Sequence, residues 1–204
     1  MEAAECGRIS ADQFLEWASG QEQRFELVDG FVVRMMAGAK QGHNVIVTNI
    51  VSSVAPQAKV GKCRTTSSNT AVQTRASTVR YPDVVVDCGP EDPDATVAED
   101  PTLVVEVSSP GTSLVDATDR LDEYQGHPAI RMIMFVEPSV VSVKLYRRDG
   151  GGVWNSEKYD ALEGVIDMPE IGSVLTLAEI YDTLLPSLQR RLHLIGTNER
   201  TNSR

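Results

Sequence analysis

The sequence predicts a mixed α/β (α+β) fold, in which a mixed central sheet is flanked by helices and preceded by an N-terminal helix and hairpin. Three observations predict it. Short runs of β-branched residues recur along the 204-residue chain, which is typical of strands. Segments with apolar residues at helical spacing lie between these runs. An Asp-Gly pair at 29–30 separates two β-prone runs, and this pair is the strongest short signal for a hairpin.

The N-terminal elements follow from capping and turn signals. Residues 9–20 predict a short helix, with Ser10 as its N-cap and a glycine as its stop. Residues 24–36 predict the hairpin around the Asp-Gly pair. Residues 43–55 predict a second helix, because their apolar residues recur at helical spacing, although β-branched side chains weaken that tendency.

The remaining segments indicate a central sheet, a further helix that packs with it and a closing helix. Two exposed strands are predicted at 62–68 and 69–77, and two apolar strands interrupted by acids at 79–89 and 102–109. A helix is predicted at 113–127, and a run of strands at 130–138, 139–150 and 153–160. The closing helix is predicted at 175–185, with Thr176 as a possible cap.

Length and composition predict one domain over residues 1–195, followed by a polar, flexible tail at 196–204. The N-terminus lacks the basic and apolar regions of a signal peptide. No apolar run approaches the ~18 residues that cross a bilayer, so we expect no membrane partner. Cys6, Cys63 and Cys88 form no CxxC pair. The simplest expectation is therefore reduced thiols in a cytoplasmic protein, without a zinc site.

Charge is distributed unevenly along the chain. The net charge is −10, which taken alone argues against a nucleic-acid partner. However, residues 30–82 contain no acid and carry seven basic residues, whereas residues 83–123 carry twelve acids and one base. Several of these acids fall in a loop at 89–101, where solvation alone explains them. The alternative is a carboxylate metal site beside a phosphate-binding surface.

Two acids interrupt apolar runs and are the candidate metal ligands. Asp83 opens one predicted strand, and Glu106 lies inside the run LVVEV of another. A buried carboxylate is costly unless a cation or strong donors compensate it. Either acid alone is explained by an edge strand that faces water. Two such carboxylates on adjacent strands favour a site for a hard divalent cation such as Mg²⁺.

These residues also carry a resemblance to a known family. The segments YPDVVVDCGP, PTLVVEVSSPGTSLVDATDRLDEYQ and IRMIMFVEPSVVSVKLYRRDG resemble the Uma-type restriction endonuclease family, which has the PD-(D/E)XK, restriction endonuclease-like fold. FELVDGFVVRMM, QGHNVIVTNI and LTLAEIY are similar to that family as well. The resemblance runs from about Ile9 to Leu185. It implies hydrolysis of phosphodiester bonds in DNA, assisted by Mg²⁺ or Mn²⁺.

The resemblance also assigns roles to individual residues. It implies that Asp83, Glu106 and the carbonyl of Val107 bind the metal. In such nucleases a lysine two residues after the second acid orients the attacking water, but Ser108 occupies that position here. The family typically places the lysine on the following helix, at the position of Arg120. Arginine neutralises phosphate charge but cannot act as a base, because its pKa exceeds about 12.

Supporting roles are open to alternatives. Glu26 and His43 match acidic and histidine positions of the family, although a histidine at a helix start is more often a cap or a surface residue. Tyr124 is expected to be half-buried, with its hydroxyl near the site. Arg120 has a bland alternative, a surface ion pair with Asp116 one helical turn away. Lys40 or Lys62 could supply a replacement amine.

Three functions remain compatible with the sequence. The first is a metal-dependent DNA endonuclease, expected to be a homodimer. The second is a catalytically weakened nuclease-fold module that binds nucleic acid or a protein partner without cutting, which the arginine at 120 and the acidic composition favour. The third is a metal-dependent hydrolase of a small phosphodiester. Retention of both Asp83 and Glu106 favours the first, because a pure binding module needs no buried carboxylate pair.

Overall fold

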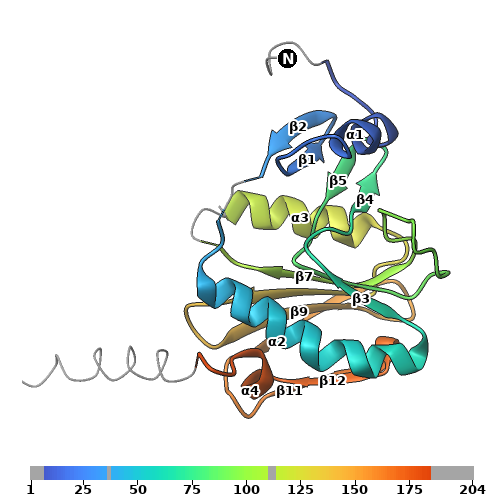
Figure 1. Ribbon diagram of the computed structural model, residues 1–204. Coiled ribbons are helices and arrows are strands. Elements are labelled where there is room, and N and C mark those ends of the chain that lie inside the picture. Colours follow the sequence, from blue (N-terminus) through green and yellow to red (C-terminus); the bar gives the residue numbers. More distant parts are fainter. Residues whose placement is uncertain (1–6, 36–37, 110–113, 185–204) are drawn as a thin grey trace, which may run out of the picture.

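The computed structural model describes residues 7–35, 38–109 and 114–184, with side chains omitted at 114–116. In Figure 1, helices α2 and α3 lie on opposite sides of a central sheet, and a smaller N-terminal layer lies beyond α3. The predicted tail at 196–204 lies outside the described residues. Among the described residues, no helix has both the length and the apolar character required to cross a membrane.

The N-terminal layer consists of helix α1 and a four-stranded antiparallel sheet of order β2-β1-β5-β4. Its elements are α1 (Ala11–Ala18), β1 (Phe25–Val28), β2 (Phe31–Arg34), β4 (Val72–Arg75) and β5 (Thr78–Arg80). Ser10 caps α1 through a capping box, as predicted. The predicted hairpin is also confirmed, and its turn residues Asp29 and Gly30 have φ of 48° and 86°, which is why an Asp-Gly pair suits this turn.

The central sheet has six strands in the order β10-β9-β8-β7-β6-β3. The strands are β3 (Arg64–Ser67), β6 (Val84–Asp87), β7 (Pro101–Val107), β8 (Met132–Glu137), β9 (Ser142–Arg148) and β10 (Trp154–Tyr159). Only β7 and β8 pair in parallel among these described strands. Helix α3 (Leu114–Gly126) connects them, because parallel neighbours need a crossover.

Alternation along β7 assigns its side chains to two cores. Leu103 and Val105 pack on the side of helix α2 (Gln41–Ala58), whereas Val104 packs on the other side with Tyr124 of α3. The α2 side also holds β11 (Val165–Met168), β12 (Ser173–Thr176) and α4 (Leu177–Ile180). Short 3-10 turns, Lys59–Gly61 and Pro169–Ile171, follow α2 and β11. Glu106 shares the face of Val104, so it points toward α3.

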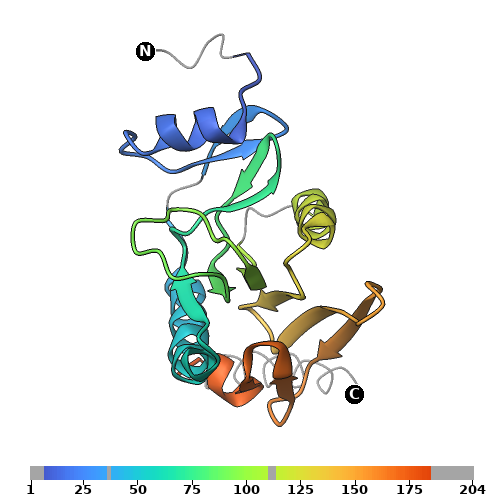
Figure 2. The same cartoon turned by 90° about the vertical axis from the view of Figure 1, so that its right-hand side faces the viewer.

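Several predicted elements differ from the structure. The single strand expected at 79–89 is broken around Pro82, and its two parts belong to different sheets. Figure 2 shows β4 and β5, the green strands of the N-terminal layer, running from that layer toward the central sheet. The strand expected to be exposed at 62–68 is half-buried, because α2 covers it. The β11–β12 hairpin was not predicted, and α4 is shorter than the closing helix predicted, although Thr176 does cap it.

The cysteine prediction was wrong. Cys63 and Cys88 form a disulfide, with their Cα atoms 4.2 Å apart. Cys63 precedes Arg64 and Cys88 follows Asp87, and these two neighbours are paired at the ends of β3 and β6, so the fold places the cysteines opposite each other. Their separation of 25 residues in the chain gave no CxxC signal. The pairing depends on strand register, which the cysteine spacing does not contain.

Asp87 closes the loop that joins β6 to β7. Its carboxylate accepts hydrogen bonds from the amides of Gly89 (2.8 Å), Asp100 (3.0 Å) and Glu99 (3.3 Å), and from Arg64 (3.2 Å). Burial opposes ionisation of Asp87, but these donors outweigh burial and lower its pKa. The carboxylate therefore stabilises the fold in its charged form.

We expect Asp87→Asn to lower the free energy of unfolding by about 1–3 kcal/mol at pH 7, because it weakens several charge-assisted hydrogen bonds. A lowered folded-state pKa contributes stability above the unfolded pKa of about 3.9 and loses it as pH falls through the folded value. The difference between wild type and variant should therefore shrink below about pH 4. Urea unfolding at several pH values measures it, and a pH-independent difference would contradict this explanation.

Candidate active site at the ends of β6 and β7

Asp83 and Glu106 lie next to each other at the junction of β6 and β7. These strands pair antiparallel with Val84 opposite Val105, so continuing the register places Asp83 opposite Glu106. The amide of Val107 donates a hydrogen bond to Asp83 Oδ2 at 2.8 Å. The side chains of Asp83 and Glu106 are 20% and 16% exposed. The fold therefore brings the two predicted carboxylates together in one half-buried site.

His43 joins this group from the first turn of α2. Its Nε2 lies 3.2 Å from Asp83 Oδ2, and its Nδ1 lies 3.3 Å from the side-chain oxygen of Asn44. The hydrogen bond to Asp83 raises the pKa of His43, against the opposing effect of burial. Its side chain is only 12% exposed. His43 is therefore part of the cluster, and the expectation of a surface or capping histidine is not met.

Glu106 is held by two donors from α3. Arg120 Nη1 donates to its Oε1 at 3.0 Å, and the Tyr124 hydroxyl donates to the same oxygen at 2.6 Å. Burial raises the pKa of Glu106 to about 7, although Arg120 and Tyr124 oppose this rise. The negative charges of Asp83 and Glu26 also raise it. Burial and the neighbouring negative charges thus outweigh the two donors at Glu106.

Arg120 bridges two carboxylates instead of forming a surface pair. Its Nη2 donates to both oxygens of Glu26, at 3.1 and 2.8 Å, while Nη1 holds Glu106. Burial lowers the pKa of Arg120, but the charges of Glu106 and Glu26 outweigh burial and raise it. Arg120 therefore stays positively charged and is held in place by two carboxylates, and we refer to it as a fixed cation. The side chain of Asp116, its alternative partner, lies outside the described residues.

Tyr124 and Glu26 are more buried than the sequence suggests. Tyr124 is fully buried, and burial raises its pKa well above the usual value, so it stays a hydrogen-bond donor to Glu106. Glu26 on β1 is 4% exposed and accepts a hydrogen bond from the amide of Tyr81 at 3.3 Å. Glu26 therefore connects the N-terminal layer to the cluster.

Two members of the cluster were missed by sequence reasoning. Arg80 on β5 and Glu123 on α3 are buried, at 7% and 4% exposure. Arg80 donates to both oxygens of Glu123 at 2.7 Å and to Glu26 at 3.0 Å. The available signal was the position of Glu123, three residues after Arg120 and thus on the same side of the helix. Because the sequence predicted one continuous strand across Pro82, it did not indicate that Arg80 belongs to a different sheet from β6 and points toward α3.

A match to a family model identifies the protein family of the chain. Residues 11–178 match the Uma2 model, which is described as "Putative restriction endonuclease". The chain belongs to the Uma2 family. This range includes every predicted site residue, and it confirms the resemblance found in the sequence.

Two relatives give the extent of the similarity. An uncharacterized protein from Synechocystis sp. is 29% identical to this Uma2 chain over 177 residues, which is 85% of the chain and 92% of the relative. The crystal structure of a protein from Anabaena variabilis, described as a putative nuclease belonging to DUF820, superposes with a TM-score of 0.68. It is 18% identical, and the match covers 85% of this chain and 97% of that one. The predicted nuclease-like fold is thereby confirmed.

The Uma2 cluster has the donor chemistry of a site for a hard divalent cation. Within the described part of the chain, the hydrogen bonds to Asp83 use Oδ2 and those to Glu106 use Oε1, which leaves Oδ1 and Oε2 without a donor there. A cation would also offset the negative charges of Asp83 and Glu26, which add to the effect of burial on the pKa of Glu106. The described residues contain no group of three His, Cys, Asp or Glu side chains arranged for a metal. A metal would therefore depend on two carboxylates and a backbone carbonyl.

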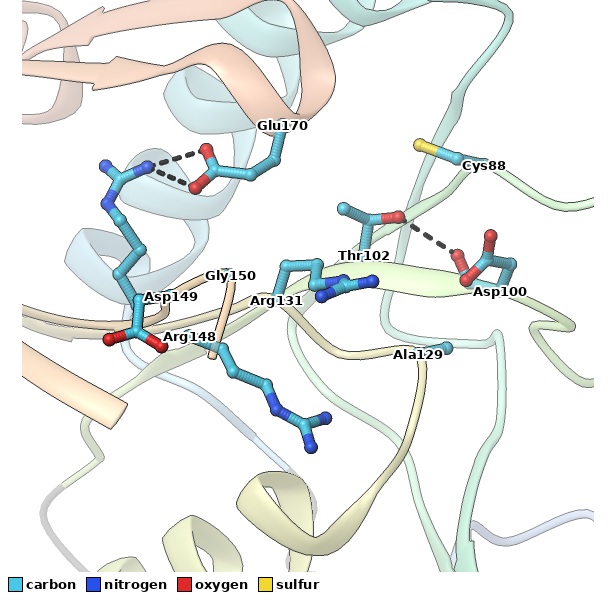
Figure 3. Close-up of a pocket in the computed structure, with 10 residues that line it drawn as sticks. Cys88, Asp100, Thr102, Ala129, Arg131, Arg148, Asp149, Gly150 and Glu170 are labelled. Carbon is cyan, nitrogen blue, oxygen red and sulfur yellow. Dashed lines mark hydrogen bonds and ion pairs between the residues drawn. The ribbon is translucent and has the colours of Figure 1, made fainter. Parts of the chain in front are cut away.

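One pocket of this Uma2 chain lies away from the cluster. Its volume is about 590 Å³, and its charged side chains are Arg131, Arg147, Arg148, Asp100, Asp149 and Glu170. Figure 3 shows Glu170 within an ion pair there. The pocket includes Thr102 near the start of β7, whereas Glu106 lies near the end of that strand. It contains none of the predicted site residues, so we place the candidate site at the carboxylate cluster.

Proposed function

We propose that this Uma2 protein is a divalent-metal-dependent DNA endonuclease that hydrolyses phosphodiester bonds. One observation carries the proposal: two adjacent carboxylates, Asp83 and Glu106, share a half-buried site with the fixed cation Arg120. The description of the Uma2 family and the description of the Anabaena protein as a putative nuclease support the class of reaction. The nature of the metal and the roles of the residues are part of the proposal.

In this proposal, Asp83, Glu106 and the carbonyl of Val107 would hold Mg²⁺ or Mn²⁺. When bound, such a cation supplies Lewis-acid activation of the phosphate and lowers the pKa of a coordinated water. His43 orients Asp83 through its ring nitrogen, and Tyr124 orients Glu106 through its hydroxyl. Each carboxylate is thus held in place by a neighbouring side chain.

Arg120 supplies positive charge beside the reacting phosphate and stabilises the charge that develops on it. Its raised pKa excludes it as the general base. Ser108 follows Glu106 by two residues, where related nucleases carry a lysine, and it offers a hydroxyl in place of an amine. Neither residue therefore replaces the lysine in accepting a proton.

The direct test is nicking of supercoiled plasmid DNA by the purified chain. We expect relaxed circles to form with Mg²⁺ or Mn²⁺ and not with EDTA, because Asp83 and Glu106 need a divalent cation to act on a phosphate. Readdition of the metal after EDTA should restore the activity. Nicking that continues in EDTA, or that is absent with both metals, would contradict the proposed function.

One observation favours the alternative of a module that binds DNA or a protein partner without cutting. Both terminal nitrogens of Arg120 are already bonded to carboxylates, so the side chain is committed before any phosphate arrives. In the plasmid experiment this alternative predicts no relaxed circles with either metal. The two functions are therefore separated by one measurement.

We further propose a homodimer that acts on DNA. A dimer could join the acid-free stretches at residues 30–82 of two copies into one basic surface, which a chain of net charge −10 otherwise lacks. The Cys63–Cys88 disulfide argues against the cytoplasm, because such bonds are rare in that reducing compartment. A count of free thiols therefore bears on the location as well as on the fold.

A further inference from the structure

The pair formed by Arg80 and Glu123 is the best-formed ion pair near the candidate site. Arg80 Nε and Nη2 each donate to one oxygen of Glu123, and both distances are 2.7 Å. Their side chains are 8% and 4% exposed. Bidentate pairs of this kind fix orientation as well as distance. The pair therefore locks β5 of the N-terminal layer to α3 in one arrangement.

Arg80 also acts on Glu26. Its third nitrogen, Nη1, donates to Glu26 Oε2 at 3.0 Å. The same oxygen accepts the 2.8 Å hydrogen bond from Arg120 Nη2. Glu26 is thus shared between two guanidinium groups, and the position of Arg80 determines how much of Glu26 remains for Arg120.

Arg120 has two nitrogens with different tasks. Its Nη2 is bound to Glu26, and its Nη1 reaches Glu106 at 3.0 Å. A planar guanidinium with one side fixed can rotate very little. The orientation of Nη1 toward Glu106 is consequently set by Glu26, and through Glu26 by Arg80.

Charge explains why Glu123 is needed. Without it, Arg80 would be a buried cation with Glu26 as its remaining carboxylate partner, and unpaired buried charge is strongly unfavourable. Arg80 would then donate hydrogen bonds to both oxygens of Glu26 and displace Arg120 from them. Glu123 prevents this competition by occupying two of the three bonded nitrogens of Arg80.

We propose that Arg80 and Glu123 are positioning residues, which hold Arg120 against Glu106 through Glu26, the carboxylate that Arg80 and Arg120 share. The contacts themselves are independent of activity, but the consequence for catalysis rests on the proposed function. A pair that only stabilised the fold would end at the interface of the two layers. This chain of contacts continues to the carboxylate that we assign to the metal.

The test compares Glu123→Gln and Arg80→Lys with a matched control, Glu170→Gln. The control removes the charge of another carboxylate that is bonded to an arginine, since Arg147 Nη1 donates to both oxygens of Glu170 at 2.6 Å. Glu170 lines the remote pocket and makes no contact with the cluster among the described residues. Arg80→Lys keeps the charge but loses the bidentate geometry, so it serves if Glu123→Gln does not fold.

Two measurements decide the proposal. In the plasmid assay, kcat should fall about tenfold or more in both cluster variants, as is typical when partners of a metal site are removed, while KM stays within about twofold. The Nε–H signal of Arg120 in a ¹⁵N NMR spectrum, assigned by its loss in Arg120→Lys, should shift in the same variants. Glu170→Gln should change neither, even if it unfolds at a lower temperature.

The possible failures are distinguishable. If the wild type does not cut, the proposed function fails, and the Arg120 signal alone decides whether the two residues position it. An Arg120 signal that is unchanged in every folded cluster variant would overturn the proposal. A shifted signal in an active enzyme whose kcat is unchanged would overturn it too, because positioning would then have no consequence.

Discussion

Asp83→Ala is expected to abolish metal-dependent nicking, with a loss of rate on the order of a thousandfold or more. A metal contributes several kcal/mol of transition-state stabilisation, and each 1.4 kcal/mol corresponds to about tenfold in rate. Asp83 is one of only two side-chain ligands that we assign, and it also anchors His43 and the amide of Val107. The measurement is the initial rate of plasmid nicking with Mg²⁺ and with Mn²⁺.

Matched variants separate this loss from a general effect of charge. Asp160→Ala also removes an acid, but Asp160 is 64% exposed and pairs with Lys158 at the surface, so its nicking rate should match wild type. Arg120→Lys should retain nicking, because it restores the lysine that the family typically places at this position, and an amine can orient the attacking water as well as supply positive charge. Nicking that persists in a folded Asp83→Ala protein would refute the assignment of the site.

Loss of the Cys63–Cys88 disulfide is expected to cost about 3 kcal/mol of unfolding free energy, because the bond closes a loop of about 25 residues in the unfolded chain. The Cys63→Ser/Cys88→Ser double variant should reproduce the effect of reductant on wild type. Urea unfolding with and without reductant measures both. Cys6→Ser is the matched control, and its stability should not change.

A thiol count tests the bond itself. The chain has three cysteines, so a protein with the Cys63–Cys88 bond should show one reactive thiol in urea without reductant. After reduction it should show three. Three thiols in the unreduced protein would mean that the bond is not formed under those conditions.

The local signals in the sequence were sufficient for much of the fold. The capping box at Ser10 and the Asp-Gly turn each specify their structure through contacts within a few residues, so they could be predicted. The hairpin of β11 and β12 carries no such turn pair. The disulfide depends on the register of β3 and β6, which long-range packing determines.

The candidate site was predictable in part for the same reason. A carboxylate inside an apolar strand, as at Glu106, identifies itself because its burial needs an explanation. Arg80 and Glu123 do not identify themselves, since an arginine at the end of a short strand and a glutamate on a helix are ordinary surface patterns. Their burial results from the approach of α3 to β5, which the sequence does not state locally.

The position of Glu26 in the N-terminal hairpin has a consequence for cooperativity. The buried Arg80 and the half-buried Arg120 both donate hydrogen bonds to this one carboxylate from β1. If the hairpin opened locally, both cations would lose a partner inside the protein, so the opening would cost far more than the fraying of a terminal segment. Slow hydrogen exchange should therefore extend from the central strands into β1, and the N-terminal layer should unfold together with the site.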